Sequence, residues 1–310
     1  MIHELPLERR TLHGHFSPEL APVLTVDPGD SVVFSCPDAG WGIGPPRDES
    51  GERERFGPRD PERDAGHALV GPFEVRGARA GQTLEVRIDE VRVGTWGITD
   101  AGGWLTPLNE RLGVAEGDGR TLVWDLDADA GVGRDQLGRE VQLRPFLGVI
   151  GMPPPEPGIH STPPPRAWGG NIDCTELVAG TSLFLPIPVD GALLSAGDPH
   201  ARQGDGEVSQ LAIECPLARG QLTIDLHDEP RLTAPIARTP EAWLTFGFDE
   251  DLDEAAARAL EGMLELMGRE HGLERLDALA LASVVVDLRV TQLVNGPRGV
   301  HAMLRHDAWR

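Results

Sequence analysis

The sequence predicts a mainly β protein that ends in a small α+β cap. Glycine and proline are abundant, at 38 and 27 of the 310 residues, and this composition indicates many turns between short strands. Before residue 235, several segments alternate apolar and polar residues, which is the pattern of half-buried strands. After residue 250, apolar residues recur instead at the spacing of a helix.

The change of pattern along the chain suggests three regions. We expect an N-terminal β domain over residues 1–140, a central β region over 141–235 and a C-terminal α+β cap with two helices over 236–310. A chain of 310 residues is long enough for two or three domains. The central region should carry the active-site cluster, since it holds a short run of acidic and histidine residues.

The β part should consist of short strands, tight turns and two long loops. Pro28-Gly29 is a turn signal between two runs of β-branched residues. Residues 84–88 alternate apolar with charged side chains, as a half-buried strand does. The charged segment 40–66 and the proline-rich segment 153–165 should be loops, because proline cannot donate to a sheet or helix ladder. Further strands are expected at 146–150, at 182–189 as an edge strand with two prolines, and at 221–226.

The last 70 residues predict two helices between strands. Acidic residues at 249–254 favour a helix N-terminus, and Gly272 should end this first helix. A second helix is expected from near Leu273 to the stop signal at Asn295-Gly296-Pro297. Strands are expected at 243–248 and 299–304.

Charge and composition exclude several classes of protein. The formal net charge of −22 speaks against a nucleic-acid or anionic-membrane partner. All 28 basic residues are arginine, so Schiff-base enzymes, P-loop nucleotide binders and hydrolases with a catalytic lysine are excluded. The three cysteines lack the spacing of a disulfide framework or a thiolate zinc site. The N-terminus has no signal-peptide pattern and no long apolar run occurs, so we expect a soluble cytoplasmic protein.

The most informative stretch is residues 193–207, which carries four acidic or imidazole side chains within ten positions: Asp198, His200, Asp205 and Glu207. On a strand, Asp198 and His200 would face the same way, and apolar residues share their parity. Charged groups that point into a core are costly unless they are paired. The pattern therefore indicates a metal site, a catalytic constellation or a buried ion pair.

Glu207 and two further side chains, Asn171 and Asp173, should approach the same site. Glu207 follows a glycine turn and shares strand parity with Leu211 and Ile213, so we expect it to be buried. Burial and the nearby Asp205 should raise the pKa of Glu207, as a general base requires. Asn171 and Asp173 share parity after two glycines and could reach one point.

These motifs resemble the acetamidase/formamidase family of amide hydrolases. Gly-Gly-Asn-x-Asp at 169–173 and Gly-Asp-x-His-x4-Asp-Gly-Glu at 197–207 are the specific elements. The resemblance covers nearly the whole chain, through the segments 22–30, 71–72, 148–151, 169–173, 191–200, 203–207 and 289–296. It implies a jelly-roll-like sandwich, a barrel-like β part and a small α/β piece. It also implies hydrolysis of short amides such as formamide and acetamide, with a divalent metal in some members.

Amide hydrolysis needs an activated water, a polarised carbonyl and a proton for the departing amine. We assign a divalent ion, zinc by its mixed nitrogen and oxygen ligands, to Asp198, His200 and Asp173. Glu207 would be the general base, and Asn171 or Asp205 would orient the reacting groups. His15 and His67 are further candidates.

The expected partners are a small amide substrate and a second copy of the chain in a homodimer. A pocket walled by tryptophans and closed by residues 153–165 should admit only short acyl groups. Two alternatives stay open on the sequence alone. One is a β protein that binds a metal or small ligand without turnover, which release of ammonia from formamide would rule out. The other is a purely structural ion-pair network of Asp198, His200 and Glu207, in which mutation would cost stability with no separate loss of turnover.

Overall fold

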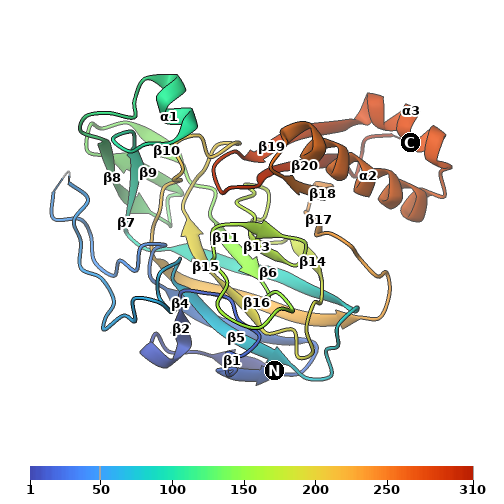
Figure 1. Ribbon diagram of the computed structural model, residues 1–310, viewed down its shortest axis with the longest axis horizontal. Helices are drawn as coiled ribbons and strands as arrows, with labels where there is room; N and C mark the ends of the chain where they lie inside the picture. The colour runs from blue at the N-terminus through green and yellow to red at the C-terminus, as the bar shows by residue number, and fades with distance from the viewer. Residues whose placement is uncertain (49, 310) are drawn as a thin grey trace.

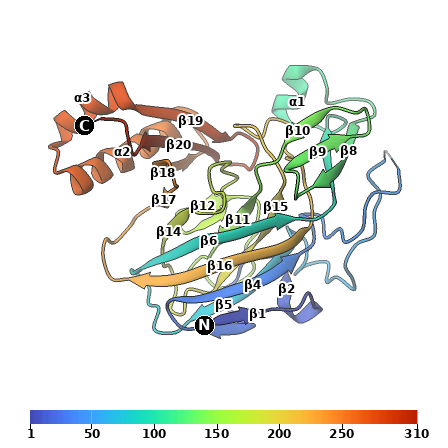
Figure 2. The same ribbon diagram turned by 180° about the vertical axis from the view of Figure 1, so that it is seen from behind.

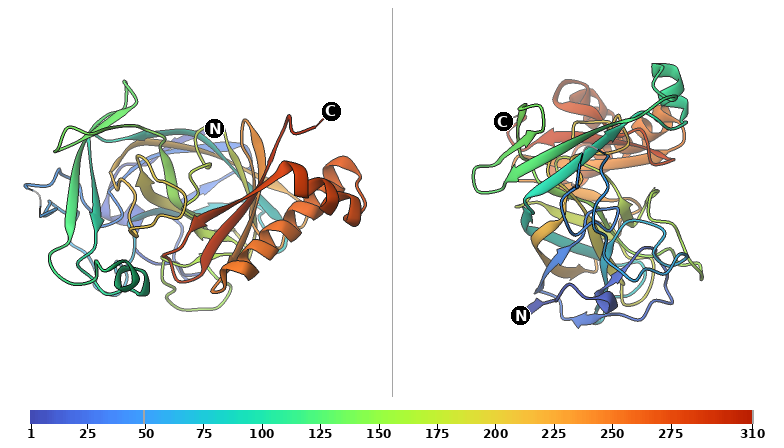
Figure 3. Two further views of the ribbon diagram at one scale, coloured as in Figure 1. Left: turned by 90° about the horizontal axis from the view of Figure 1, so that it is seen from above. Right: turned by 90° about the vertical axis from the view of Figure 1, so that its left-hand side faces the viewer.

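The computed structural model describes residues 1–48 and 50–309 and confirms a mainly β protein with a small helical C-terminal part (Figure 1). Three sheets form the body, and none of them closes into a barrel within these two ranges. Figure 3 shows that the two long helices lie at one end of the molecule, away from the four-stranded sheet. No helix of the described residues is long and apolar enough to cross a membrane.

The largest sheet has nine strands and runs through the whole length of the molecule (Figure 2). Its strands, in spatial order, are β1 (Ile2–Glu4), β4 (Asp30–Cys36), β16 (Leu217–His227), β6 (Thr83–Val93), β14 (Ser182–Pro186), β17 (Ile236–Arg238), β18 (Ala242–Asp249), β20 (Arg298–Arg305) and β19 (Val286–Gln292). Strands from all three predicted regions join this sheet, so the division of the chain into three domains stays a prediction.

The second sheet has seven strands and carries the functional residues. It consists of β12 (Pro165–Arg166), β13 (Gly169–Asn171), β11 (Phe146–Gly151), β15 (Leu194–His200), β5 (Leu69–Val75) and β2 (Leu12–His13), with β3 (Leu24–Val26) beside β5. It packs on the nine-stranded sheet through one continuous apolar core, to which both sheets contribute. Every residue of β15 is buried, so this strand lies at the centre of the sandwich.

A third, four-stranded sheet covers one end of the sandwich. Its strands are β7 (Trp96–Ala101), β8 (Arg120–Asp127), β9 (Val132–Asp135) and β10 (Glu140–Gln142). The short helix α1 (Pro107–Leu112) follows β7; Thr106 caps its N-terminus and Gly113 its C-terminus. Ile98 of β7 bridges to Glu214, which brings this sheet next to the segment after β15.

The expected strands at 84–88, 146–150, 221–226, 243–248 and 299–304 are confirmed in β6, β11, β16, β18 and β20. The edge-strand prediction for 182–189 is wrong. Strand β14 lies between β6 and β17, and it pairs with both. Pairing is possible because the strand ends at Pro186, so neither proline interrupts the ladder from within.

The C-terminal part contains the only two long helices of the described residues. Helix α2 (Leu252–His271) begins after Asp251, whose side chain accepts two backbone N–H groups, and ends at Gly272 as predicted. Helix α3 (Arg275–Val285) is shorter than predicted, because residues 286–292 form β19. The β-branched run Val284–Val286 favours a strand, and pairing with β20 outweighs the helical spacing.

Candidate active site

Four carboxyl groups and one imidazole are buried together at one end of β15. The exposed fractions of these residues lie between 1% and 6%. Strand β15 provides Asp198 and His200, and the loop after β13 provides Asp173. The irregular segment after β15 provides Glu207 and Glu214. We call these five residues the acidic cluster.

His200 is the centre of the acidic cluster. Its Nε2 lies 3.2 Å from Asp198 Oδ1 and 3.3 Å from Glu214 Oε1. On the other side of the ring, Nδ1 lies 2.9 Å from Gln203 Oε1. Phe146 of β11 packs edge-on against the imidazole, with ring centroids 5.0 Å apart. Both ring nitrogens therefore have partners, and the orientation of the ring is fixed.

Asp173 approaches His200 from the loop after β13. Its Oδ1 lies 3.9 Å from His200 Nδ1 and has no hydrogen-bond partner among the described residues. Its Oδ2 accepts a hydrogen bond from Asn295 Nδ2, and its backbone carbonyl accepts one from Gln203 Nε2 at 2.8 Å. One carboxylate oxygen is thus held and the other is free within the site.

Unusual backbone conformations and one glycine allow the carboxylates of the acidic cluster to lie close together. Asp173, Asp198 and Glu207 have φ angles of 52°, 57° and 45°, a left-handed conformation that is uncommon outside glycine and that collects at functional sites. Gly148 of β11 leaves room between the first two. A Cβ atom at Gly148 would lie 2.5 Å from Asp173 Oδ1 and 2.5 Å from Asp198 Oδ2.

Burial changes the proton affinity of these groups in different directions. Burial raises the pKa of Asp173 well above its usual range, and the neighbouring Asp198 and Glu214 carboxylates add to this. Burial likewise raises the pKa of Glu207, with Asp173 as the next contribution, and it raises the pKa of Glu214. Burial opposes ionisation of Asp198 too, but His200, His67 and a hydrogen bond with Glu214 together outweigh it and hold the pKa of this carboxyl below its usual value.

His200 responds to the same charges. Burial disfavours its protonated form, but Glu214 and Asp198 together hold its pKa well above the usual value. Without a metal, these directions favour a protonated His200 beside an ionised Asp198, and they favour the protonated forms of Asp173, Glu207 and Glu214. A cation in the site would compete with these protons.

The donor set of the acidic cluster fits a divalent metal. Two overlapping groups each offer three ligand atoms within 4.8 Å of one another: Asp173 with Asp198 and His200, and His200 with Glu207 and Glu214. Four buried oxygens near this point lack a hydrogen-bond partner: Asp173 Oδ1, Glu207 Oε2, Glu214 Oε2 and Asn171 Oδ1. Buried acceptors without donors are costly, and a bound cation would satisfy them. Imidazole with carboxylates and no thiolate suits an open, catalytic zinc site.

The structure brings Asp198, His200 and Asp173 together, as the sequence indicated. Asn171 is buried on β13, opposite Val149 of β11. Glu207 is buried too, but not as predicted: it sits in a turn closed by its backbone N–H to Gly204 O at 3.2 Å, not on a strand. Its burial therefore comes from the turn rather than from strand parity.

The remaining candidates lie apart from the acidic cluster. Asp205 accepts hydrogen bonds from Arg289 at 2.6 Å and from Thr175 at 3.2 Å. The main causes of the raised pKa of Glu207 are burial and Asp173, not Asp205. His15 bonds the carbonyl of Arg63 at 2.7 Å. His67 bonds Thr162 at 2.9 Å, although its charge also contributes to the low pKa of Asp198.

Sequence reasoning missed three members of the site. Glu214 is buried and lies between Ile213 and Cys215 in the sequence. A single acidic residue within an apolar run was the signal that could have identified it. Gln203 follows His200 by three residues and orients both that ring and Asp173. Asn295 arrives from the C-terminal part, in a segment predicted to end a helix, and no local pattern indicated it.

A cavity of about 270 Å³ adjoins the acidic cluster. Glu207 and Gln203 line its wall, so both face the cluster and the cavity. Trp124 lines it as well, in line with the expected tryptophan wall. The remaining lining residues are Thr99, Val141, Arg202, Gly204, Asp205, Val208, Ser209, Leu211, Ala212 and Ile213.

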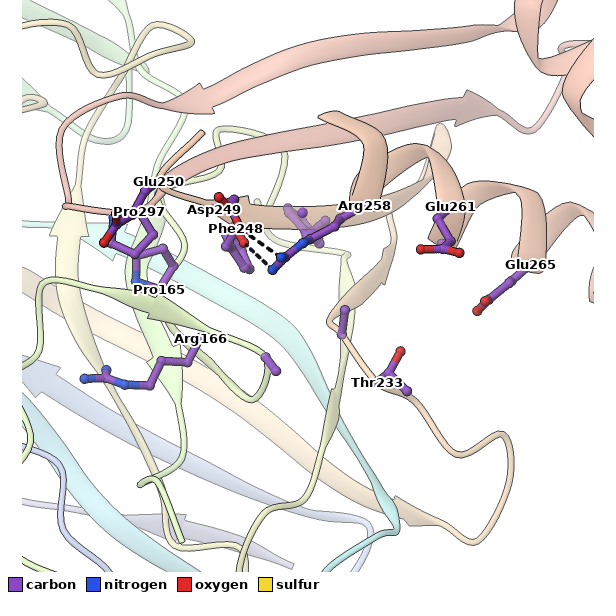
Figure 4. Close-up of a pocket in the computed structure, with 15 residues that line it drawn as sticks. Pro165, Arg166, Thr233, Phe248, Asp249, Glu250, Arg258, Glu261, Glu265 and Pro297 are labelled. Atoms are coloured by element: carbon purple, nitrogen blue, oxygen red, sulfur yellow. Dashed lines mark hydrogen bonds and ion pairs between the residues drawn. The ribbon is translucent and has the colours of Figure 1, made fainter. Parts of the chain in front are cut away.

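A larger cavity of about 680 Å³ lies elsewhere, between the C-terminal part and the segment around Pro165 (Figure 4). Glu261 and Glu265 of α2 extend toward it, and Arg258 is held by Asp249 on its wall. No member of the acidic cluster lines this cavity. The predicted lid of residues 153–165 contributes Pro165 here and no residue to the smaller cavity.

A buried imidazole and several carboxyl groups with shifted pKa values, next to a small cavity, define a hydrolytic type of site. The chain matches the sequence model of the Acetamidase/Formamidase family over residues 3–162 and 156–307, and it belongs to that family. Family membership makes it an amidase.

Solved structures and a curated relative agree with this assignment. An acetamidase from Bacillus halodurans is 28% identical, with a TM-score of 0.83 and coverage of 97% of each chain. An acetamidase from Yersinia enterocolitica is 25% identical, with a TM-score of 0.85, covering 100% of this chain and 94% of that one. A formamidase from Methylophilus methylotrophus is 25% identical over 250 residues, which are 64% of this chain and 60% of the relative.

Proposed function

We propose that this amidase hydrolyses short linear carboxylic amides of the formamide and acetamide type, releasing ammonia and the acid. The observation that carries the proposal is the position of Glu207, which lies in the acidic cluster and also on the wall of the 270 Å³ cavity. A purely structural network would be expected to pair its buried atoms. Glu207 Oε2 and Asp173 Oδ1 have no hydrogen-bond partner in the described chain.

Asp198, His200 and Asp173 would hold a divalent metal ion, which we propose is zinc. A bound zinc ion lowers the pKa of a coordinated water toward about 7 and polarises a carbonyl oxygen. Gln203 supports this ligand set, because its amide contacts His200 Nδ1 and the Asp173 carbonyl together. Such supporting contacts fix the orientation of metal ligands.

Glu207 is the proposed general base. Its carboxyl takes a proton from the attacking water while the water oxygen bonds to the amide carbon. The same proton then passes to the nitrogen as the C–N bond breaks, so that ammonia and the acid are the products. The raised pKa of Glu207 suits this exchange, because a carboxylate with a raised pKa is a stronger base toward the attacking water.

Asn171 and Asp205 are the proposed orienting residues. Asn171 Oδ1 is buried and unpaired, so it can accept a hydrogen bond from a bound amide or water. Asp205 has a less direct role, because its ion pair with Arg289 fixes the turn that carries Glu207.

The size of the cavity favours short substrates. At about 270 Å³ it lies at the lower end of the range for small-molecule sites. The test is an ammonia assay on linear amides of one to four carbons, with benzamide and a dipeptide amide for comparison. We expect formamide or acetamide to give the highest kcat/KM. Preference for benzamide would contradict the substrate class, and the absence of ammonia with every amide would contradict the function.

We further propose a cytoplasmic homodimer. The three cysteines are free and buried, in keeping with a reducing compartment. Leu276 and Val284 of α3 are each 80% exposed, and β19 stands at the end of the nine-stranded sheet. This apolar face suits self-association in a chain of strongly negative charge. Light scattering of wild-type protein and Leu276→Glu tests it: a dimer that dissociates is expected, and a wild-type monomer would contradict it.

A further inference from the structure

The segment 291–297, which connects β19 to β20, reaches from the C-terminal part into the acidic cluster. Asn295 Nδ2 donates a hydrogen bond to Asp173 Oδ2. The same segment also holds the turn before Glu207: Gly206 N donates to Thr291 O at 3.1 Å, and Leu293 N donates to Gly206 O at 3.0 Å. It therefore contacts the acidic cluster at Asp173 and also holds the residue next to Glu207, although it is about 80 residues or more away in sequence.

Gln292 gives this segment its shape. Its side chain is fully buried, with no exposed surface. Its Oε1 accepts the backbone N–H groups of Val294 at 2.8 Å and Asn295 at 3.0 Å, and its Nε2 donates to Pro297 O at 2.8 Å. Because all three hydrogen bonds go to the segment itself, the loop is folded around this one amide. The position of Asn295 follows from the position of Gln292.

The contact with Asn295 fixes the plane of the Asp173 carboxylate. The torsion of a carboxylate is broad, so the group can turn about its Cβ–Cγ bond unless one oxygen is held. With Oδ2 bound to Asn295, the unpaired Oδ1 is left 3.9 Å from His200 Nδ1 and beside the open space at Gly148. The carboxylate is thus arranged in advance for a ligand atom.

We propose that Asn295 is a positioning residue for Asp173, and that Gln292 acts through it by fixing the loop. The inference rests on the proposed metal-assisted function, and it makes the C-terminal part an obligatory component of the site. Asn295 touches neither the substrate nor the metal in this account. Its contribution is the orientation of one ligand, which is typically worth ten- to a hundredfold in metal affinity.

The test is titration of chelator-treated protein with zinc for wild type, Asn295→Ala and Gln292→Leu. We expect a zinc dissociation constant raised ten- to a hundredfold in both variants, with kcat reduced at saturating zinc and KM for formamide little changed. Asn295→Leu, which is similar in size and removes the N–H donors without adding a charge, should behave like the alanine variant. Equal zinc affinity in wild type and Asn295→Ala would overturn the proposal.

Asn109→Ala is the matched control. Asn109 is a buried asparagine whose side chain donates a hydrogen bond, here to the backbone carbonyl of Trp104 at 3.0 Å, and it lies in α1. Its loss should lower the melting temperature and leave zinc affinity unchanged. If Asn109→Ala weakened zinc binding as much as Asn295→Ala, the effect would be general destabilisation and the proposal would be wrong.

A crystal structure of metal-free Asn295→Ala decides the proposal independently of the function. We expect the Asp173 carboxylate to rotate away from the direction it has in metal-free wild type. If wild type neither binds zinc nor releases ammonia, the proposed function fails, while a rotated carboxylate would still support Asn295 as its positioning residue. An unchanged carboxylate would overturn the positioning role.

Discussion

Burial, together with the Asp173 carboxylate, raises the pKa of Glu207, so these two acids from different loops are electrostatically coupled. The pKa of Asp173 is raised as well, and burial is again the largest cause. When two neighbouring carboxyl groups both resist ionisation, they can have different roles: one can bind a cation, and the other can accept and release a proton. This division is the basis of the mechanism proposed above.

Glu207→Gln tests the proton-transfer role. The substitution keeps the shape of the side chain and removes its ability to accept a proton. We expect kcat for formamide to fall by about a hundredfold or more, with the circular dichroism spectrum unchanged. A glutamine variant that hydrolyses formamide at the wild-type rate would remove Glu207 from the mechanism.

Gly148→Ala tests the convergence of the two carboxylates. The new methyl group would meet Asp173 Oδ1 and Asp198 Oδ2 at 2.5 Å, so at least one carboxylate must move. We expect loss of stoichiometric metal and at least tenfold lower kcat/KM. Gly44→Ala is the control, because its Cβ would make only an ordinary contact of 3.6 Å with Glu54. Normal metal content in Gly148→Ala would contradict the assigned ligand pair.

Asp205→Asn tests whether Asp205 only orients the site, as proposed, or takes part in proton transfer as Glu207 does. The substitution weakens the ion pair with Arg289, which is 2.6 Å long and about one third exposed at both ends. Because exposed ion pairs contribute little stability, we expect at most a tenfold loss of kcat and a nearly unchanged melting temperature. A loss as large as that of Glu207→Gln would assign Asp205 a direct chemical role instead.

The metal-free protein should lose stability as pH rises. The pKa values of Asp173 and Glu207 are raised in the folded state, so the folded state holds protons that the unfolded chain releases above about pH 4. Their contribution is present below that pH and is lost as pH rises through the folded-state values. Urea midpoints between pH 5 and pH 8 in chelator should therefore decrease, and less steeply in Glu207→Gln. Equal slopes for both proteins would contradict a raised pKa at Glu207.

Zinc should reverse this trend. Binding to deprotonated ligands becomes stronger as pH rises, so added zinc should stabilise the protein most at the higher pH. Urea midpoints measured with and without zinc at pH 6 and pH 8 check this. A zinc effect that shrinks with rising pH would point to binding outside the acidic cluster.

Much of the β body follows from local sequence patterns. The alternation at 84–88 and at 221–226 predicts two strands, and in the structure they pair directly with each other in the nine-stranded sheet. The pattern failed at 286–292, where helical spacing and β-branched residues compete. There, pairing with β20 settled the conformation, and that pairing partner lies further along the chain.

The acidic cluster was predictable only in part. Asp198 and His200 are two residues apart, so their shared direction is a local property of β15. Glu214 and Asn295 join the site through contacts between distant segments, and such contacts leave no spacing signal in one sequence. Glu207 was assigned correctly to the interior, but a turn rather than a strand places it there.

The most direct test of the central claim is zinc content measured together with ammonia release, on the same preparations. Wild type, chelator-dialysed wild type, dialysed protein with zinc restored, and His200→Gln should be compared with formamide as substrate. His13→Gln is the control, since His13 is a buried histidine that bonds Ser195 at 3.0 Å and not the acidic cluster. We predict one zinc per chain in wild type and His13→Gln, loss of zinc and activity after dialysis and in His200→Gln, and recovery on adding zinc. Full activity in dialysed protein and in His200→Gln, with no stoichiometric metal in wild type, would contradict it.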